Sequence, residues 1–509
     1  MLRSRLQTPE ARSLLLVAGI IITIIAVPHF IHNVILYHSP WNWHKPVEES
    51  NWIATSHSWV DRTLCHWAGF CGLAHIALSR GSSVERNRAG PFGKGNSHKL
   101  PSGRQHRLDA TWHSGGKQIH SSSVSSNYTE VPQFVLDYAP LVHLYSGERF
   151  WPGDLAEHLE HTRPLQDYSP LIGRMEPANL SNLDQLNKYS NGKNIFLTSK
   201  DDPETIPDWL GGARNIPKNA SLEPHHLGAQ TSIQIPAAFA KDDAEVDSQG
   251  NDEDWTSVGD GDQVEEQDNP EQRPSPAIPI KLPAPRSRSS STPKKGGRST
   301  APALLIVVPK DNDVVDAFWF FFYSFNLGNK VFNTRFGNHV GDWEHSMVRF
   351  HRGVPKAVYL SEHEWGQAYT YDAVEKSGSR PVIYSASGSH AMYAVPGIHP
   401  YALPWGILKD VTDEGPLWDP AQNVRSFVYD YRNDALRASQ LDPDAPTEWF
   451  HFAGRWGDKY YPLGDKRQYR LVGEYHYVSG PEGPKFKKLG RQQICQARGR
   501  CYISKKLHR

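Results

Sequence analysis

One short stretch of this chain concentrates side chains that could bind a metal or move a proton. Residues 337–345 read Gly-Asn-His-Val-Gly-Asp-Trp-Glu-His, and they contain His339, Asp342, Glu344 and His345. Imidazole and carboxylate ligands together suit zinc, manganese or iron, and a metal-bound water is a nucleophile at neutral pH. These four residues are therefore candidate ligands of a divalent metal cofactor.

Two later histidines extend this set. His363 lies between two glutamates, and His390 follows a Gly-Ser dipeptide. The most aromatic run of the chain, residues 318–325, comes shortly before the first stretch. Because an apolar wall around a few polar groups is typical of a buried site, we include both histidines among the metal-ligand candidates.

Strand geometry limits which of these groups can meet. Neighbouring residues on a strand point to opposite faces, so Asp342 and Glu344 would share one face. His339 and His345 would then lie on the other face. All four converge only if Gly341 permits a turn or a bulge between them.

A structural interpretation competes with the metal site. The carboxylates could cap turns or hold an arginine such as Arg335 or Arg349, with the histidines hydrogen-bonded in an aromatic core. No nucleophile–base pair is legible in the sequence. Ser387 and Ser389 lie near His390, but serine beside glycine usually marks a turn. We therefore assign no catalytic residue.

Composition and motifs give no support to several common activities. The 509 residues contain 55 Lys and Arg against 55 Asp and Glu, so no charge excess favours nucleic acid as a partner. The sequence has no GxGxxG after a strand, no GxxxxGK[ST], no GxSxG and no HExxH. Nucleotide binding and the common hydrolase mechanisms are not indicated.

The N-terminal region predicts a membrane anchor. Residues 13–37 are mostly apolar and are long enough to cross a bilayer as one helix. Arg3, Arg5 and Arg12 precede them, so the positive-inside rule leaves residues 1–12 in the cytosol. We expect a single-pass signal anchor in an endomembrane organelle (ER, Golgi or vacuole), with the bulk of the chain in the lumen. A cleaved signal peptide is the alternative.

The cysteines form two pairs at opposite ends of the chain. Cys65 and Cys71 lie near one end, and Cys495 and Cys501 near the other. Their spacing does not match a CxxC metal or redox motif. Because a lumen is oxidising, we expect disulfides, most simply Cys65–Cys71 and Cys495–Cys501. Cross-pairing of the two ends, or four free buried thiols, are the alternatives.

Three triplets fit the N-glycosylation pattern. They begin at Asn127, Asn179 and Asn219. All three lie on the side that the anchor predicts to be lumenal. Each is a candidate attachment site for a glycan.

Composition divides the lumenal part of the chain. Residues 38–80 are rich in tryptophan and carry the first cysteine pair, and residues 81–130 have the composition of a disordered linker. Residues 131–509 are expected to form one β-rich lumenal domain. Within it, residues 241–300 are acidic and then basic with Pro and Ser, which predicts a long disordered insertion.

Strand signals dominate the lumenal domain. Short apolar or aromatic runs separated by Gly, Pro and Asp predict a mainly β fold, a β-sandwich or jelly-roll-like domain with a few short helices. Residues 154–161 predict a short helix with Asp154 as its N-cap, and residues 433–440 predict another. Residues 134–144 predict a buried strand broken by a proline. The expected strands are 304–308, 317–325, 346–350, 357–360, 382–384, 427–429 and 469–477.

Several longer motifs resemble those of the fungal vacuolar protein sorting-associated protein 62 family. The resemblance covers roughly residues 131–501 and implies a role in delivering proteins to the vacuole. It assigns no catalytic residue. It rests on residues 138–146, 150–154, 157–159, 337–345, 361–363, 388–393, 415–420 and 453–461.

Two functions therefore compete. In the first, a non-catalytic lumenal module holds a protein or glycan partner, with Trp405, Trp418 and Trp456 as candidate contact residues. Core packing is the alternative role of these tryptophans. In the second, the metal-ligand candidates form the centre of a metal-dependent lumenal hydrolase.

Overall fold

The computed structural model describes most of the predicted lumenal domain and a short N-terminal module. The predicted anchor, most of the linker 81–130 and most of the insertion 241–300 lie outside the described residues. Within the described residues, no helix is long and apolar enough to span a membrane. The described residues are 51–79, 104, 107, 130–172, 176–218, 295–331, 333–363, 365–401, 408–471, 473–497 and 501–507.

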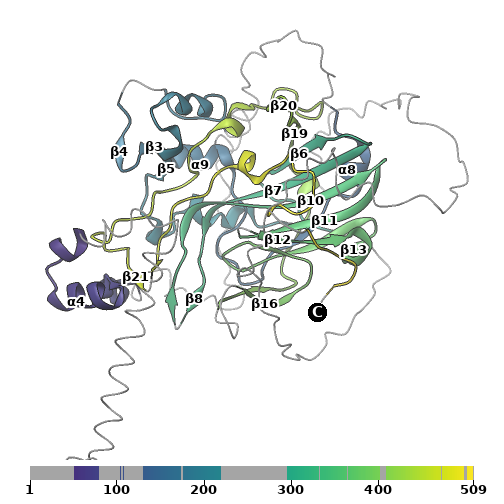
Figure 1. Ribbon diagram of the computed structural model, residues 1–509. Coiled ribbons are helices and arrows are strands. Elements are labelled where there is room, and N and C mark those ends of the chain that lie inside the picture. The colour runs from purple at the N-terminus through teal and green to yellow at the C-terminus, as the bar shows by residue number, and fades with distance from the viewer. Residues whose placement is uncertain are drawn as a thin grey trace, which may run out of the picture.

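An eight-stranded sheet forms the centre of the domain (Figure 1). Its strand order is β20-β19-β6-β7-β10-β11-β12-β23, antiparallel except for the pairs β19–β6 and β12–β23. The strands are β6 (Ala303–Pro309), β7 (Val314–Asn326), β10 (His339–His351), β11 (Val354–Glu362), β12 (Trp365–Thr370), β19 (Val424–Asp430), β20 (Ala435–Ala438) and β23 (Ile503–Ser504).

Strand β7 shows why this sheet is buried on both faces. Its even-numbered aromatics, Phe318, Phe320 and Phe322, belong to one core. The alternate residues Trp319 and Phe321 belong to another core on the opposite face. Side chains alternate across a strand, so an uninterrupted aromatic run supplies both faces at once.

A second sheet covers one of these faces. It has the order β13-β14-β2-β18, with β15 paired to β14. Val142, Ile383 and Trp418 from this sheet pack with Trp319 and Phe321 of β7. The two sheets thus face each other across a shared core. The strands are β2 (Leu141–His143), β13 (Lys376–Ser377), β14 (Arg380–Ser385), β15 (Met392–Tyr393) and β18 (Leu417–Trp418).

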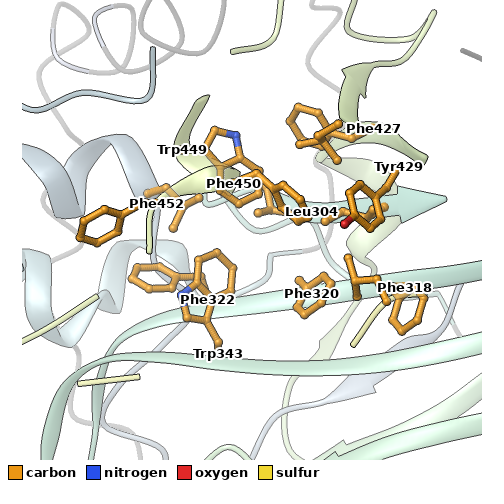
Figure 2. Close-up of a cluster of buried hydrophobic side chains, with 14 of the residues drawn as sticks. Leu304, Phe318, Phe320, Phe322, Trp343, Phe427, Tyr429, Trp449, Phe450 and Phe452 are labelled. Carbon is orange, nitrogen blue, oxygen red and sulfur yellow. The ribbon is translucent and has the colours of Figure 1, made fainter. Parts of the chain in front are cut away.

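Short helices and loops cover the other face. Helix α9 (Leu155–His161), 3₁₀ helix η1 (Leu183–Lys188) and η8 (Glu448–His451) contribute to the same core as Phe320. Figure 2 shows Trp449 and Phe450 across from the aromatic side chains of β7. The fold is mainly β with a few short helices, as the sequence predicts.

Smaller elements complete the described chain. A three-stranded sheet has the order β4-β3-β5, and hairpins join β8 to β9 and β16 to β17. These elements are β3 (Thr162–Gln166), β4 (Ser169–Pro170), β5 (Ile195–Ser199), β8 (Lys330–Val331), β9 (Thr334–Arg335), β16 (Gly397–Tyr401), β17 (Leu408–Thr412), α10 (Asp208–Gly211), η2 (Gly192–Asn194), η3 (Pro203–Thr205), η4 (Ala213–Asn215), η5 (Tyr371–Ala373), η7 (Pro420–Gln422) and η9 (Pro484–Lys487).

An N-terminal module docks on the edge of the domain. Helix α4 (Trp59–Ala68) is followed by β1 (Phe70–Cys71) and helix α5 (Leu73–Ser79). Strand β1 joins β21 (Arg470–Leu471) and β22 (Glu474–Tyr475) in a three-stranded sheet. The module is therefore attached to a segment almost four hundred residues away in sequence.

Most predicted strands form, but three predicted elements differ from the structure. The predicted strand 469–477 is instead two short strands, β21 and β22, that pair with each other antiparallel. Residues 133–137 form helix α8 (Gln133–Asp137), and only 141–143 of the predicted strand pair in a sheet. The predicted helix 433–440 is instead strand β20, because pairing with β19 buries its alternate residues Leu436 and Ala438. Helix α9 forms as predicted, and Asp154 Oδ1 accepts the N–H groups of Ala156 and Glu157.

Candidate functional site

Asp342 and Glu344 project from β10 into the space between the two sheets. They pair with Tyr323 and Phe321 of β7, whose side chains lie in the inter-sheet core. Both carboxylates are buried. The alternation predicted from sequence therefore holds for this pair, and it places two acidic groups at one end of an apolar interior.

Gly341, the third residue of β10, has a backbone conformation that other residues rarely adopt. Its φ of 70° lies in the left-handed region, which favours glycine. A Cβ atom here would overlap the carbonyl oxygen of Trp456. The segment that contains Trp456 thus lies directly against β10, and the adjacent Gly457 is equally close to Val340.

His390 reaches Asp342 from the loop between β14 and β15. Its Nδ1 lies 2.9 Å from Asp342 Oδ2, and its Nε2 lies 3.0 Å from the carbonyl oxygen of Phe150. A carbonyl only accepts, and so does an ionised Asp342, so the protonated imidazole is the form that satisfies both contacts. Tyr323 stacks on it at 3.7 Å between ring centroids.

The charges around His390 favour this protonated form. Burial alone lowers its pKa, but the hydrogen bond to Asp342 and the nearby charge of Glu148 outweigh burial and raise the pKa above its usual value. Glu148 Oε2 lies 3.9 Å from His390 Nε2. The group is an internal ion pair with a second carboxylate beside it.

A second polar cluster is centred on Asp410 of β17, which the sequence analysis missed. Asp410 Oδ2 accepts from His363 Nε2 and from the Tyr393 hydroxyl, each at 2.8 Å. Its Oδ1 accepts from Ser389 Oγ at 2.8 Å and from Asn329 Nδ2 at 3.0 Å. Four donors on one carboxylate hold together loops that are distant in sequence.

His363 is held at the edge of this second cluster. Burial lowers its pKa, but the hydrogen bond and charge of Asp410 outweigh burial and raise it. Its φ of 56° places it in a tight turn between β11 and β12. The charge of Asp342 also raises the pKa of His363, so the two clusters influence each other electrostatically.

Burial raises the pKa of two carboxyl groups in this region, Glu344 and Glu362. Burial and the charge of Asp342 raise the pKa of Glu344 to about 8, and the Ser361 hydroxyl donates to it. Burial also raises the pKa of Glu362 to about 8, with Asp410 contributing. Both carboxyls are therefore mostly protonated at neutral pH.

His345 lies apart from these clusters, whereas His339 is close enough for the charge of Asp342 to act on the pKa of its imidazole. His345 stacks on Phe320 and lies near Phe318 and Tyr359, on the opposite face of the sheet from Glu344. Burial holds its pKa well below the usual value. His339 Nδ1 lies 2.6 Å from the carbonyl oxygen of Gly341.

The six metal-ligand candidates are thus only partly brought together. His390 meets Asp342, His363 meets Asp410, and Glu344 meets Ser361. Among the residues that the structure describes, no group of three or more His, Cys, Asp or Glu is arranged to hold a metal ion. The metal site remains a prediction.

The arginines of the competing interpretation bind elsewhere. Arg349 Nε and Nη2 donate to Asp316 at 2.6 and 2.7 Å, and Lys310 Nζ lies 2.9 Å from the same carboxylate. Arg335 donates to the carbonyl oxygen of Gly328. A histidine and a serine, rather than an arginine, are the partners of Asp342 and Glu344.

The cysteines are bonded in sequence-neighbouring pairs. The Sγ atoms of Cys65 and Cys71 are 2.06 Å apart, and those of Cys495 and Cys501 are 2.12 Å apart. The simplest of the expected pairings is the one in the structure.

Other candidate residues have mixed outcomes. Asn179 is half-buried, and its Oδ1 accepts the N–H group of Ser181 at 2.9 Å. Trp418 and Trp456 are fully buried, so core packing, the alternative role, is confirmed for them and contact with a protein or glycan partner is not. Asn127, Asn219 and Trp405 lie outside the described residues.

Comparison with known proteins identifies the family. Residues 295–465 match the family model of vacuolar protein sorting-associated protein 62. The yeast protein of that name, from Saccharomyces cerevisiae, is 31% identical over 395 residues, covering 72% of this chain and 68% of the relative. The chain belongs to the vacuolar protein sorting-associated protein 62 family.

A second member and one solved structure extend the comparison. The yeast family member TDA6, also named for vacuolar protein sorting, is 32% identical over 397 residues, with 72% of this chain and 68% of TDA6 covered. The crystal structure of the non-toxic HaNLP3 protein matches 30% of this chain and 65% of that chain. At 12% identity and a TM-score of 0.17, that match carries no argument.

Proposed function

We propose that this chain acts in vacuolar protein sorting as a membrane-tethered lumenal module that binds a protein or glycan partner without catalysing a reaction. Family membership is the observation that carries the proposal, because two yeast relatives that share about two thirds of their length with this chain are named for vacuolar protein sorting. The two bonded cysteine pairs support a lumenal location, since disulfides persist in oxidising compartments.

The polar clusters between the sheets support a structural rather than a catalytic role. Both nitrogens of His390 are engaged, so this imidazole has no lone pair with which to take a proton. The hydroxyl of Ser389 donates to Asp410, and that of Ser361 donates to Glu344. The first bond fixes the β14–β15 loop against β17, and the second joins the adjacent strands β10 and β11.

The sorting role can be tested in yeast cells that lack both relatives. Such cells are expected to secrete part of a soluble vacuolar hydrolase, and expression of this chain is expected to restore its delivery. The secreted fraction of the hydrolase is the measurement. Normal delivery in the doubly deleted cells, or failure of a well-expressed chain to restore it, would overturn the proposal.

Glu344→Gln separates the binding role from a catalytic one. Glutamine resembles the protonated carboxyl that Glu344 carries at neutral pH, so the variant is expected to fold and to restore sorting as well as the native chain. Loss of sorting in a folded Glu344→Gln chain would argue against a module without chemistry.

A metal-dependent lumenal hydrolase is the second candidate. The observation in its favour is that Asp342 and Glu344 share one buried face, with His363 close enough for the charge of Asp342 to raise its pKa. A divalent cation there could replace the proton that Glu344 otherwise keeps, and its bound water would supply the nucleophile.

Metal analysis of the purified full-length chain distinguishes the two functions. A stoichiometric divalent ion that is lost in Glu344→Gln and kept in His345→Phe would favour the hydrolase, because His345 lies on the other face of the sheet. Metal-free protein with an unchanged fold would rule out the metal-dependent hydrolase.

A further inference from the structure

Helix α4 presents large apolar side chains to solvent. The side chains of Trp59, Val60 and Trp67 are 70%, 44% and 50% exposed. With 3.6 residues per turn, Val60 and Trp67 lie about 20° apart around the helix and Trp59 lies about 80° from Trp67, so the three share one side of the helix. Isolated exposed apolar residues are ordinary, but two tryptophans and a valine on one face of one helix indicate a contact surface.

The opposite face of α4 fixes the helix to the domain. Asp61, Cys65 and Ala68 are buried, and they follow the i, i+4, i+7 spacing of a packed helix face. Cys65 is bonded to Cys71, and both pack against Leu463. The tryptophan face is therefore held outward by a rigid attachment.

The outer face of α4 carries no carboxylate, because the acidic residue of the helix is buried on the other side. Asp61 is the only acidic residue of the helix, and its Oδ1 accepts the N–H groups of Gly72 and Leu73 at 3.1 Å each. The exposed side adds Thr63 and His66 to the apolar residues. Nothing on this face of the helix would repel an anionic lipid surface.

The chain keeps this face close to a bilayer if residues 13–37 cross it. Thirteen residues separate position 37 from position 51, where the described chain begins. A fully extended linker of that length spans at most about 45 Å. Tryptophan prefers the interfacial layer of a membrane, where one end of its ring is apolar and the other is wet.

We propose that the outer face of α4, formed by Trp59, Val60 and Trp67, inserts into the headgroup layer of the bilayer that holds the predicted anchor. The inference rests on the membrane tether of the proposed function. Contact at α4 would fix how the β domain is oriented above the membrane, because α4 is bonded to that domain through β1 and the disulfide.

Lipid quenching of tryptophan emission tests this contact in the full-length chain. The protein is reconstituted into phosphatidylcholine vesicles with and without brominated acyl chains. Bromine is expected to reduce the emission of the native chain, and the double variant Trp59→Ser/Trp67→Ser is expected to lose a large part of that reduction. Trp365→Ser is the matched control, because Trp365 is 56% exposed on β12, and it should leave the reduction unchanged.

The outcomes separate this inference from the tether itself. If the chain floats with the vesicles but bromine acts equally on the native chain and the double variant, the inference is overturned and the tether stands. Shielding of both tryptophans from aqueous iodide as well as from bromine would indicate a protein partner or a second copy, and would also overturn it. If the chain does not float with the vesicles, the tether and the inference fail together.

Discussion

His390 links the central sheet to the chain around Phe150. It joins Asp342 of the central sheet to the carbonyl oxygen of Phe150, and it stacks on Tyr323. A buried ion pair is costly to break, because removing one member leaves the other charge without a partner. Removing one member of the pair therefore destabilises the fold strongly, although the intact pair adds little net stability.

Replacing His390 by Phe is expected to lower the free energy of unfolding by about 3–5 kcal/mol. Phenylalanine keeps the stacking on Tyr323 but removes both hydrogen bonds, so the loss reports the polar contacts. Urea unfolding measures it, with the exposed His57→Phe as the control. A His390→Phe variant within about 0.5 kcal/mol of the native chain, the usual range of surface changes, would contradict the role given to this residue.

Asp458 gives the domain a pH-dependent stability. Burial raises its pKa to about 6, and hydrogen bonds from the Tyr461 hydroxyl and the Ser199 N–H only partly oppose this. Between about pH 4 and pH 6 the folded chain therefore holds a proton here that the unfolded chain has lost. Stability from this group is complete below pH 4 and is lost as the pH rises through 6, in total about 3 kcal/mol at 1.36 kcal/mol per pKa unit.

Asp458→Asn is expected to remove this slope. Unfolding free energies at intervals from pH 4 to pH 7 should fall less steeply with rising pH in the variant than in the native chain. The exposed Asp444→Asn should follow the native profile. Parallel profiles for Asp458→Asn and the native chain would show that Asp458 is already ionised at pH 4.

At the residue scale, the sequence predicts only those relations between site residues that follow from the alternation of side chains along a strand. It placed Asp342 and Glu344 on one face because that follows from the strand period alone. It could not find Asp410, which gathers its donors from loops up to 81 residues away. Nor could it pair His390 with Asp342, because that contact spans 48 residues and depends on how two sheets meet.

At the scale of elements, strands with long apolar runs were predictable and short edge elements were not. Strand β7 is predictable from its local sequence, since every position in residues 317–323 is apolar or aromatic and buried. Strand β20 has only four residues, and it is extended because β19 offers it a partner. Helix α8 has five residues and follows Pro132, so its pattern is too short to distinguish a helix from a strand.

Two glycines, one just before β10 and one within it, provide a matched test of how closely β10 packs against the segment around Trp456. Gly337 and Gly341 both have positive φ, 86° and 70°, but an added Cβ meets nothing within 4 Å at Gly337 and overlaps the Trp456 carbonyl at Gly341. Gly337→Ala should cost about 1–2 kcal/mol for backbone conformation. Gly341→Ala should cost about 1–3 kcal/mol more, because the backbone must move.

Urea unfolding of the two glycine variants, with the native chain alongside, measures this difference. Equal losses would mean that the segment around Trp456 moves away from β10 without cost. That outcome would contradict the close packing that places Asp342 and Glu344 between the sheets.

At the scale of the whole molecule, the chain combines a β domain and a disulfide-bonded N-terminal module with a predicted membrane anchor. Family membership and the mainly β fold are shown, and the tether is proposed from the sequence of residues 13–37. The module lies beside β21 and away from the central sheet (Figure 1). That position leaves the two-sheet core and its polar clusters clear of the membrane that α4 is proposed to contact.

Protease protection in intact microsomes shows on which side of the membrane the β domain lies. For a lumenal domain we expect a fragment shortened by at most the dozen residues before the anchor. We also expect cleavage of the domain only after detergent, and a faster-migrating band after glycosidase treatment. Digestion of the domain without detergent, together with unchanged mobility and four thiols that react with an alkylating reagent, would contradict the lumenal location.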